Sequence, residues 1–253
     1  MSSPIGIIDS GVGGLTVLKE VVAVLPHQHY IYCADTKHIP YGEKSIEELI
    51  KLVKHTVQYL VKQNVSLIVV ACNTISGTVL KEIEKEYPHI TFIQMIQHGL
   101  QGVTKYTPHS IGVLATQATI REGTYIKRLS QYFPHASIQA LPAPQLVLWA
   151  EQGNTSGSDV EVYIQSLYQD FRVQPDLLIL ACTHFPYFIQ ILSTVVSQHT
   201  HIYNPASSIA QYIMSLVQPL NTSQLVVSLP NIDWYITGKS DILYALASQQ
   251  GLR

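Results

Sequence analysis

Two cysteines, Cys72 and Cys182, have the setting expected of reactive side chains. Each follows a run of aliphatic residues that ends in alanine, reading Leu-Ile-Val-Val-Ala-Cys-Asn-Thr over 67–74 and Leu-Leu-Ile-Leu-Ala-Cys-Thr-His over 177–184. Such a run is typical of a parallel strand that is covered on both faces. The strand would deliver its thiol to the carboxyl end of a sheet, where open α/β folds bind ligands.

Two matched thiols suit one reaction in particular, the inversion of a stereocentre. One thiolate removes a proton from one face of the substrate, and the opposite thiol delivers a proton to the other face, without a cofactor. A thiolate at Cys72 is favoured by a position before a helix N-terminus. His184 can exchange protons with Cys182, and Asp9, at the end of the first strand, can do so for the other thiol.

Other interpretations of the two cysteines are open at this point. Both could be inert apolar residues at strand ends. A redox disulfide is less consistent with the sequence, because redox couples usually have Cys-x-x-Cys spacing. A cysteine hydrolase could use His184 as its base, but the second cysteine would then have no role.

The elements that must hold these residues alternate between strand and helix, and they repeat. Residues 110–116 align with residues 4–10 at an offset of 106 (111 − 5), and the two cysteines are 110 positions apart (182 − 72). A repeated strand–helix alternation predicts the α/β class, with two pseudo-symmetric, doubly wound parallel-sheet lobes. We expect a discontinuous first lobe, 1–96 plus 208–253, and a second lobe, 97–207.

Local signals refine this prediction. The glycines at 11, 13 and 14 form a turn between strand and helix, but they match neither a dinucleotide fingerprint nor a Walker loop. Ser45 should cap a helix that runs to about residue 62, with Glu48 in the capping-box position. We further expect one continuous helix over 117–132, a helix capped by Asp159, and short closing strands at 225–229 and 234–237.

Composition limits the classes of function. The chain has 253 residues, of which 47% are hydrophobic and 13% charged, so it can bury a sizeable core and is not a disordered chain. A formal net charge of −2 argues against a nucleic-acid partner. We expect no membrane span and no signal peptide, and therefore a cytoplasmic location with reduced thiols. The three cysteines lack zinc-site spacing, so no metal is expected.

Several segments together resemble the glutamate racemases of the aspartate/glutamate racemase superfamily. They span most of the chain and are Asp9-Ser-Gly-Val-Gly-Gly-Leu-Thr-Val17, Asp35 with Pro40-Tyr-Gly42, Ala71-Cys-Asn-Thr-x-Ser76, Gly112-Val-Leu-Ala-Thr116 with Thr119, and Cys182-Thr-His-Phe-Pro186. The resemblance implies an active site between two lobes. It also implies cofactor-independent interconversion of L- and D-glutamate, which supplies D-glutamate for peptidoglycan, and family members are often homodimers.

The resemblance also implies roles for particular residues. Cys72 and Cys182 would be the two proton donors and acceptors, assisted by Asp9 and His184 respectively. The residues that would bind substrate are Ser10, Tyr41, Gly42, Asn73, Thr74, Thr116, Thr119 and Thr183.

The sequence departs from the family pattern at positions that carry no proton-transfer group. These are Gln97, His98, Ala118, Leu141, Ala181 and Asn204, whereas Glu151 is retained. Two alternatives to a glutamate racemase remain. One is another enzyme of the superfamily, such as an aspartate racemase, and the other is a catalytically silent relative that binds D-glutamate.

Overall fold

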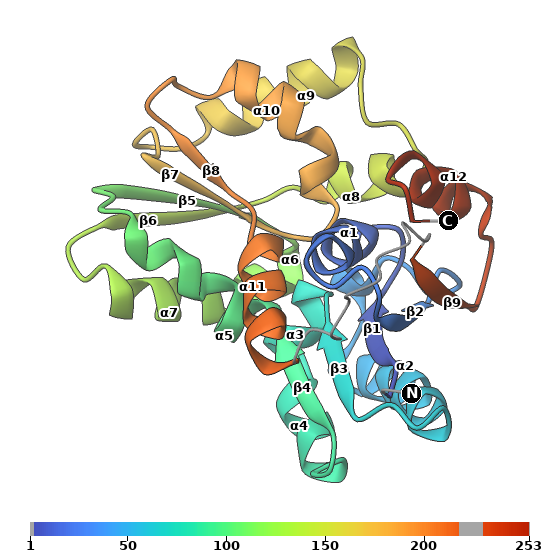
Figure 1. The fold of residues 1–253 in the computed structure, drawn as a ribbon. Coiled ribbons are helices and arrows are strands. Elements are labelled where there is room, and N and C mark those ends of the chain that lie inside the picture. The colour runs from blue at the N-terminus through green and yellow to red at the C-terminus, as the bar shows by residue number, and fades with distance from the viewer. Residues whose placement is uncertain (1–2, 218–229, 253) are drawn as a thin grey trace.

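The computed structural model describes residues 3–217 and 230–252 and contains two parallel sheets with helices on their faces (Figure 1). The first sheet has the strand order β4 (Thr91–Gln94), β3 (Leu67–Val70), β1 (Ile5–Asp9), β2 (His29–Ala34) and β9 (Asn231–Ile236). The second has the order β8 (His201–Tyr203), β7 (Leu177–Ala181), β5 (Ser110–Ala115) and β6 (Ser137–Pro142).

The two sheets share the order of their first four strands, and β9 extends the first sheet beside β2. In each, the first strand of the lobe lies in the middle, the second strand pairs on one side of it, and the third strand pairs on the other side. The chain therefore reverses its winding between β1 and β3 and again between β5 and β7. Such switch points are the ligand sites of doubly wound sheets. The prediction of two parallel-sheet lobes with an internal repeat is confirmed.

Helices and 3₁₀ turns connect the strands. The α-helices are α1 (Leu15–Val24), α2 (Ile46–Lys62), α3 (Asn73–Thr78), α4 (Leu80–Glu86), α5 (Met95–Gly99), α6 (Gln117–Glu122), α7 (Thr124–Tyr132), α8 (Pro144–Glu151), α9 (Ser158–Gln169), α10 (Ile189–Val195), α11 (Ala206–Leu216) and α12 (Asp241–Gln249). The 3₁₀ turns are Tyr41–Glu43, Leu100–Lys105 and Phe185–Phe188. No helix within the two described ranges is long and apolar enough to cross a membrane.

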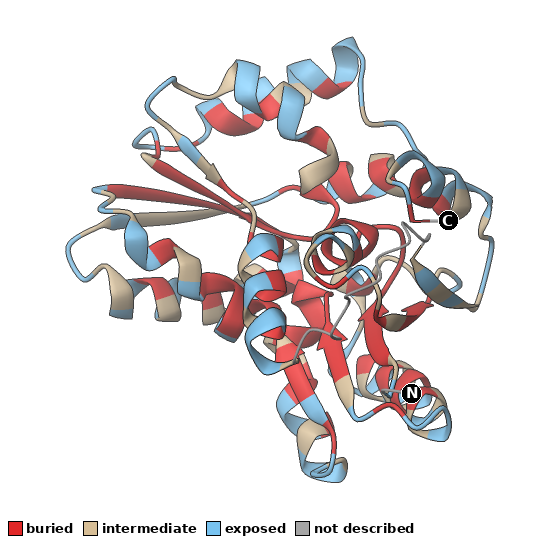
Figure 2. Cartoon of the chain, viewed as in Figure 1, coloured by how far each residue is buried: buried red, intermediate tan, exposed pale blue. Residues whose placement is uncertain are grey.

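One apolar core passes through both sheets. Ile7 on β1 and Leu180 on β7 belong to the same buried cluster, which also contains Leu18 of α1, Leu146 of α8 and Ile209 of α11. Figure 2 shows this band of buried residues running from one sheet to the other through α1. Two further clusters cover the outer faces, one under α2 and one under α7. The central strands are consequently buried on both faces, as their continuous aliphatic runs predict.

The sheets support the lobe division in broad terms. We propose that the lobes are 1–96 plus 208–253 and 97–207, since β1 to β4 and β9 share one sheet and β5 to β8 share the other. The second boundary falls inside α11, whose residues pack on α1 as well as on α5.

Some local predictions are confirmed and others are wrong. The Ser45 hydroxyl accepts a hydrogen bond from the Glu48 N–H and caps α2 as expected. The helix over 117–132 is divided, because Gly123 adopts a left-handed conformation (φ 65°) between α6 and α7. Gly157, not Asp159, occupies the cap of α9, and Asp159 lies in the first turn. The strand expected at 225–229 lies outside the described residues.

Helix α8 was not predicted. Pro144 stands at its first turn and is followed by Leu146 and Val147, both buried. Proline at the start of a short apolar run is a helix signal that was available in the sequence. The omission matters because α8 ends at Glu151, which the site uses.

Candidate active site

Four strand ends meet around one cavity of about 270 Å³. Ser10 follows β1, Cys72 follows β3, Thr116 follows β5 and Cys182 follows β7, and all four residues line it. The cavity therefore lies where the switch points of the two sheets face each other. Its walls combine two thiols with hydroxyl and amide groups, a set that suits a small polar substrate.

Ten of the twelve residues singled out from the sequence line this cavity. They are Ser10, Tyr41, Gly42, Cys72, Asn73, Thr74, Thr116, Cys182, Thr183 and His184. The other two, Asp9 and Thr119, are buried and do not line the cavity. Asp9 is hydrogen-bonded to Thr183 and Thr119 to Thr116, and both of these partners are lining residues. The fold thus brings together side chains that lie far apart in the sequence.

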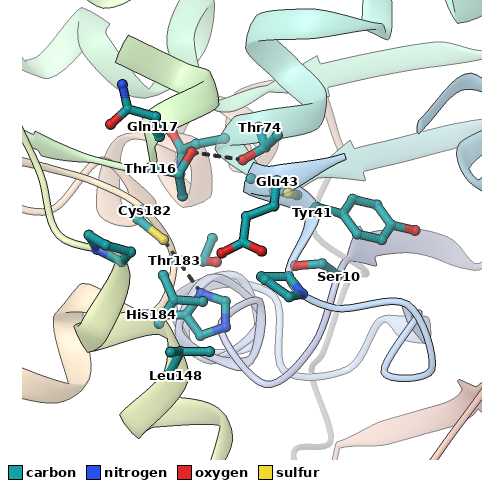
Figure 3. A pocket seen from close by; sticks show the side chains of 16 residues that line it. Ser10, Tyr41, Glu43, Thr74, Thr116, Gln117, Leu148, Cys182, Thr183 and His184 are labelled. Carbon is teal, nitrogen blue, oxygen red and sulfur yellow. Dashed lines mark hydrogen bonds between the residues drawn. The ribbon is translucent and has the colours of Figure 1, made fainter. Parts of the chain in front are cut away.

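Cys182 belongs to a chain of polar contacts that ends on a carboxylate. Its Sγ lies 3.5 Å from Nδ1 of His184, as Figure 3 shows, and Nε2 of His184 lies 2.6 Å from Oε1 of Glu151. Burial disfavours the charged imidazole, but the Cys182 sulfur and the Glu151 carboxylate outweigh it, so the pKa of His184 is raised well above its usual value. The shift favours the protonated form of His184, which contacts Cys182 directly.

Glu151 also connects the two lobes. Its Oε1 accepts a hydrogen bond from the backbone N–H of Val12 at 3.0 Å, in the glycine turn after β1. A side chain on Gly11 would collide with this carboxylate, and one on Gly13 would collide with Thr183 and His184. The glycines of the turn are therefore required by close packing against the Cys182 side of the site.

Cys72 stands in a different electrostatic environment. It is the N-cap residue of α3 and is 5% exposed. Burial and then the nearby Asp9 charge raise the pKa of its thiol, and hydrogen bonds from the N–H groups of Ile75 and Thr74 oppose this only in part. The expectation that the helix N-terminus holds Cys72 partly as thiolate is wrong, because desolvation outweighs the helix dipole.

Asp9 is buried behind the cavity lining and contacts residues of both lobes. Its carboxylate accepts hydrogen bonds from the Gly11 N–H at 3.1 Å and from the Thr183 hydroxyl at 3.3 Å. Burial raises its pKa from 3.8 to about 6, although the His184 charge acts in the opposite direction. A carboxyl group with this pKa can gain and lose a proton near neutral pH, as an acid or base catalyst must.

Three threonines form a hydrogen-bonded row across the lobes. Thr74 Oγ1 lies 3.1 Å from Thr116 Oγ1, a contact drawn in Figure 3. Thr116 Oγ1 in turn lies 3.0 Å from Thr119 Oγ1 and accepts the Thr119 N–H as the cap of α6. Thr119 therefore contacts the lining residue Thr116 but does not itself line the cavity.

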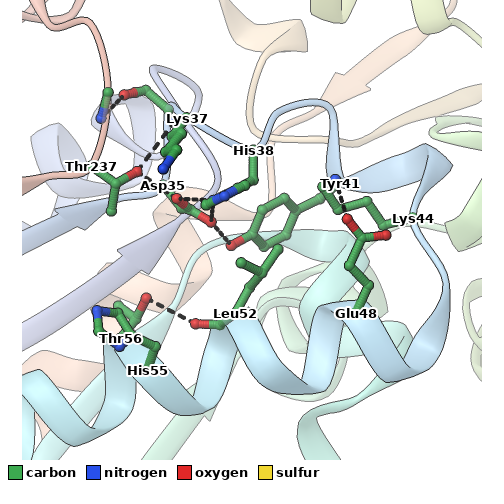
Figure 4. Close-up of polar contacts among 12 residues, drawn as sticks. Asp35, Lys37, His38, Tyr41, Lys44, Glu48, Leu52, His55, Thr56 and Thr237 are labelled. Carbon is green, nitrogen blue, oxygen red and sulfur yellow. Dashed lines mark hydrogen bonds and ion pairs between the residues drawn. The ribbon is translucent and has the colours of Figure 1, made fainter.

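The loop that carries Tyr41 and Gly42 is held from behind by Asp35. The Tyr41 hydroxyl donates to Asp35 Oδ2 at 2.7 Å, and His38 Nδ1 lies 2.9 Å from Oδ1 (Figure 4). Thr237, after β9, donates to the same carboxylate. The Tyr41 ring therefore points toward Asp35, although the residue belongs to the cavity lining (Figures 3 and 4).

Six cavity residues were not identified from the sequence. The carboxylate of Glu43 extends into the cavity in Figure 3, and Gln117 lies at its edge. The remaining four are apolar: Pro40, Pro144, Val147 and Leu148. Glu43 directly follows the Tyr-Gly pair and could have been included on that basis. The α8 residues could not, because only the tertiary fold brings that helix to the site.

The six departures from the family pattern lie outside the cavity lining. His98 accepts the Gln94 N–H through Nδ1 and stacks on Tyr212, with ring centres 4.4 Å apart. Asn204 accepts the Ala206 N–H at the start of α11. Ala118 and Ala181 are buried, and neither Gln97 nor Leu141 lines the cavity. None of the six positions therefore contributes to the cavity lining.

No group of three or more His, Cys, Asp or Glu side chains in the described part of the chain is arranged to hold a metal ion. Cys33, Cys72 and Cys182 are all free.

Comparison with known proteins identifies the family. The family model for Asp/Glu/Hydantoin racemase matches residues 5–213. The chain belongs to this family. The family consists of racemases, so the protein is an isomerase. A glutamate racemase from Oceanobacillus iheyensis is 33% identical over 253 aligned positions, covering 98% of this chain and 91% of that protein.

Solved structures of the family share the fold. Glutamate racemase from Francisella tularensis, in complex with D-glutamate, is 29% identical and superposes with a TM-score of 0.82, covering 99% of this chain and 94% of that one. An aspartate racemase from Picrophilus torridus is 18% identical, with a TM-score of 0.60 and coverage of 85% and 94%. The latter shares the fold with this chain at a greater structural distance.

Proposed function

We propose that this protein is a glutamate racemase that interconverts L- and D-glutamate with two thiols. The observation that carries the proposal is that Cys72 and Cys182, at equivalent strand ends of two equivalent lobes, line the same cavity. The relatives that cover nearly the whole chain are glutamate racemases, which supports glutamate as the substrate.

The unequal surroundings of the thiols define a starting protonation state. Cys182 beside protonated His184 is the base, and Cys72, whose pKa is raised by burial, is the acid. The Cys182 thiolate takes the proton from Cα, and the bonding electrons remain on the substrate as a carbanion. The Cys72 S–H then gives its proton to the opposite face of Cα and becomes a thiolate. The reverse reaction uses the same groups in exchanged roles.

Asp9 and His184 restore the thiols after each turnover. At Cys182 the proton taken from Cα leaves to solvent, because His184 is already protonated, and the charge of His184, in direct contact, stabilises the thiolate that remains. Asp9, with a pKa of about 6, supplies a proton on the Cys72 side and regains one from solvent. Neutral donors from Ser10, Asn73, Thr74 and Thr183 bind the substrate carboxylates without competing for the Cα proton.

The biological setting follows from this chemistry. The reaction needs no cofactor, because the thiols themselves remove and supply the proton. Both must stay reduced, which favours the cytoplasm. The product D-glutamate would supply peptidoglycan synthesis. We also propose a homodimer without a nucleic-acid partner, in line with the net charge of −2, and light scattering would measure the oligomeric state.

The decisive experiment measures racemisation in D₂O, starting from each enantiomer separately. Cys72→Ser and Cys182→Ser keep the shape of the side chain but lose the acidic thiol. Each should lower kcat by roughly 10²- to 10⁴-fold, the usual contribution of a positioned acid or base. Cys33→Ala removes the third cysteine, buried in β2 away from the cavity, and should keep racemase activity.

The outcomes separate the competing functions. Full activity in both site variants would exclude the two-thiol mechanism. Binding of D-glutamate with no deuterium at Cα in the unaltered protein would identify a silent relative. A substrate panel in which aspartate is the preferred substrate would make the protein an aspartate racemase.

A further inference from the structure

A tyrosine outside the cavity lining contacts a residue inside it. Tyr125 stands in the first turn of α7, in the second lobe, and its hydroxyl donates a hydrogen bond to Oδ1 of Asn73 at 2.5 Å. Asn73 is the first residue of α3, directly after Cys72, in the first lobe. Both residues are only 2% exposed. The contact therefore joins the two lobes beside one of the thiols.

The Tyr125 hydroxyl is the donor of this hydrogen bond. Burial raises the pKa of the Tyr125 phenol above its usual value, so the hydroxyl keeps its proton. A protonated phenol next to an amide oxygen donates to it. The carbonyl end of the Asn73 side chain is thus oriented toward Tyr125, and the NH₂ end is oriented away from it.

The NH₂ end of Asn73 has no partner among the residues that the structure describes. Its Nδ2 is fully buried and makes no hydrogen bond there. An unsatisfied buried donor costs about 1–3 kcal/mol, so such a donor usually has a partner, which can be a protein group, a water molecule or a bound ligand. Asn73 belongs to the cavity lining, between Cys72 and Thr74 in the sequence, so this donor is on a side chain at the wall of the space where a substrate would bind.

We propose that Tyr125 is a positioning residue that holds the Asn73 amide with its NH₂ group toward the substrate, where it donates to a carboxylate. The inference rests on the proposed function, since it takes an amino acid with a carboxylate group as the ligand. If Asn73 turned over, its carbonyl oxygen would face that carboxylate and repel it. The hydrogen bond that the Tyr125 hydroxyl donates to the carbonyl oxygen stabilises the orientation seen in the structure.

The test uses Tyr125→Phe, which deletes the hydroxyl and keeps the ring. KM for D-glutamate should rise roughly ten- to hundredfold, the usual effect of losing a hydrogen bond to a charged group, while kcat changes much less. Tyr30→Phe is the matched control, because Tyr30 is equally buried and its hydroxyl donates to the Leu25 carbonyl, away from the cavity. It should leave KM unchanged.

A double-variant cycle shows whether Tyr125 acts through Asn73. In an Asn73→Ala background, adding Tyr125→Phe should cause no further rise in KM. A purely structural role would give the same loss in both backgrounds and would overturn the proposal, as would an unchanged KM in Tyr125→Phe alone.

A measurement on the unaltered protein covers the case in which Tyr125→Phe does not fold. The Asn73 side-chain NH₂ signals, assigned by their loss in Asn73→Asp, should shift when D-glutamate is added to ¹⁵N-labelled protein. Unshifted NH₂ signals at saturating D-glutamate would overturn the proposal. Failure of the unaltered protein to bind or racemise glutamate would instead overturn the proposed function, so the two failures are distinguishable.

Discussion

At the scale of single residues, the two halves of the site are alike in position and unlike in charge. Cys182 has a protonated histidine beside it, and that histidine is held by Glu151. Cys72 has the buried Asp9 nearby and no cationic neighbour among the causes that shift its pKa. A pair of identical residues can serve as base and acid at one moment because their surroundings differ.

The Asp9 carboxyl should make stability depend on pH. Its pKa is about 6 in the folded protein, against the 3.8 of an exposed aspartate, so the folded state binds more protons between these values. The stability that protonated Asp9 contributes is complete below pH 3.8 and is lost as pH rises through 6. Asp9→Asn removes this loss, and its unfolding free energy relative to the unaltered protein should rise by about 2 kcal/mol between about pH 4 and pH 7.

Urea unfolding at several pH values measures this difference, and Asp176→Asn provides a control of opposite sign. Burial opposes ionisation of Asp176, but the N–H groups of His109 and Ser110 outweigh it and lower its pKa. That variant should lose stability, relative to the unaltered protein, as pH rises through the carboxyl range. A difference for Asp9→Asn that does not change with pH would contradict the assignment. Asp9→Asn should also lower racemase activity.

At the scale of elements, the turn between β1 and α1 has no room for side chains. A Cβ atom on Gly13 would overlap Thr183 and the His184 ring, which belong to the segment after β7. The two strand ends must therefore approach closely for the site to form. This explains why glycines stand there without any phosphate-binding motif.

Gly13→Ala should damage catalysis by displacing His184 from Cys182. A displacement of about 1 Å at a catalytic group can cost about a hundredfold in rate, so kcat/KM should fall by roughly that factor. Gly77→Ala in α3 is the matched control: its new Cβ would meet only Ile96, at 3.4 Å. It should keep activity and gain about 0.5–1 kcal/mol in unfolding free energy, because alanine is preferred to glycine within helices.

Steady-state kinetics and thermal unfolding on both glycine variants measure these effects. Equal activity of Gly13→Ala and the unaltered protein would show that the turn adjusts without moving His184.

At the scale of the whole molecule, the lobes are joined by a common core as well as by polar contacts. The buried cluster around α1 contains residues of both sheets. Thr16 on α1 donates to the Thr183 carbonyl at 3.0 Å, and Tyr187 donates to the Val12 carbonyl at 2.9 Å. Contacts of this kind make the two lobes depend on each other for stability.

Thermal unfolding should therefore occur as a single transition that D-glutamate shifts upward. At a concentration of about 100 times Kd, a ligand bound only to the folded state adds about 2.7 kcal/mol. For a chain of this size, that corresponds to a rise in Tm of roughly 5–10 °C. Differential scanning calorimetry measures both properties. Two separate transitions, or a shift of only part of the signal, would show that the lobes unfold independently.

The sequence by itself determined the strands, the repeat and the residues at the strand ends. Hydrophobic runs that end in Ala-Cys define buried parallel strands, because both of their faces are covered. The repeat offsets predicted two equivalent lobes, and ten of the residues chosen from the sequence line one cavity. These are local features, so a linear pattern contains them.

The tertiary structure alone decided the long-range contacts that hold those strand ends in place. Glu151 reaches Val12 across 139 positions, and Tyr125 reaches Asn73 across 52. Whether Cys72 is a thiol or a thiolate depends on how completely the fold excludes water, which outweighs the local helix N-terminus. Burial and long-range contacts exist only once the lobes have packed, so no local pattern in the sequence could predict them.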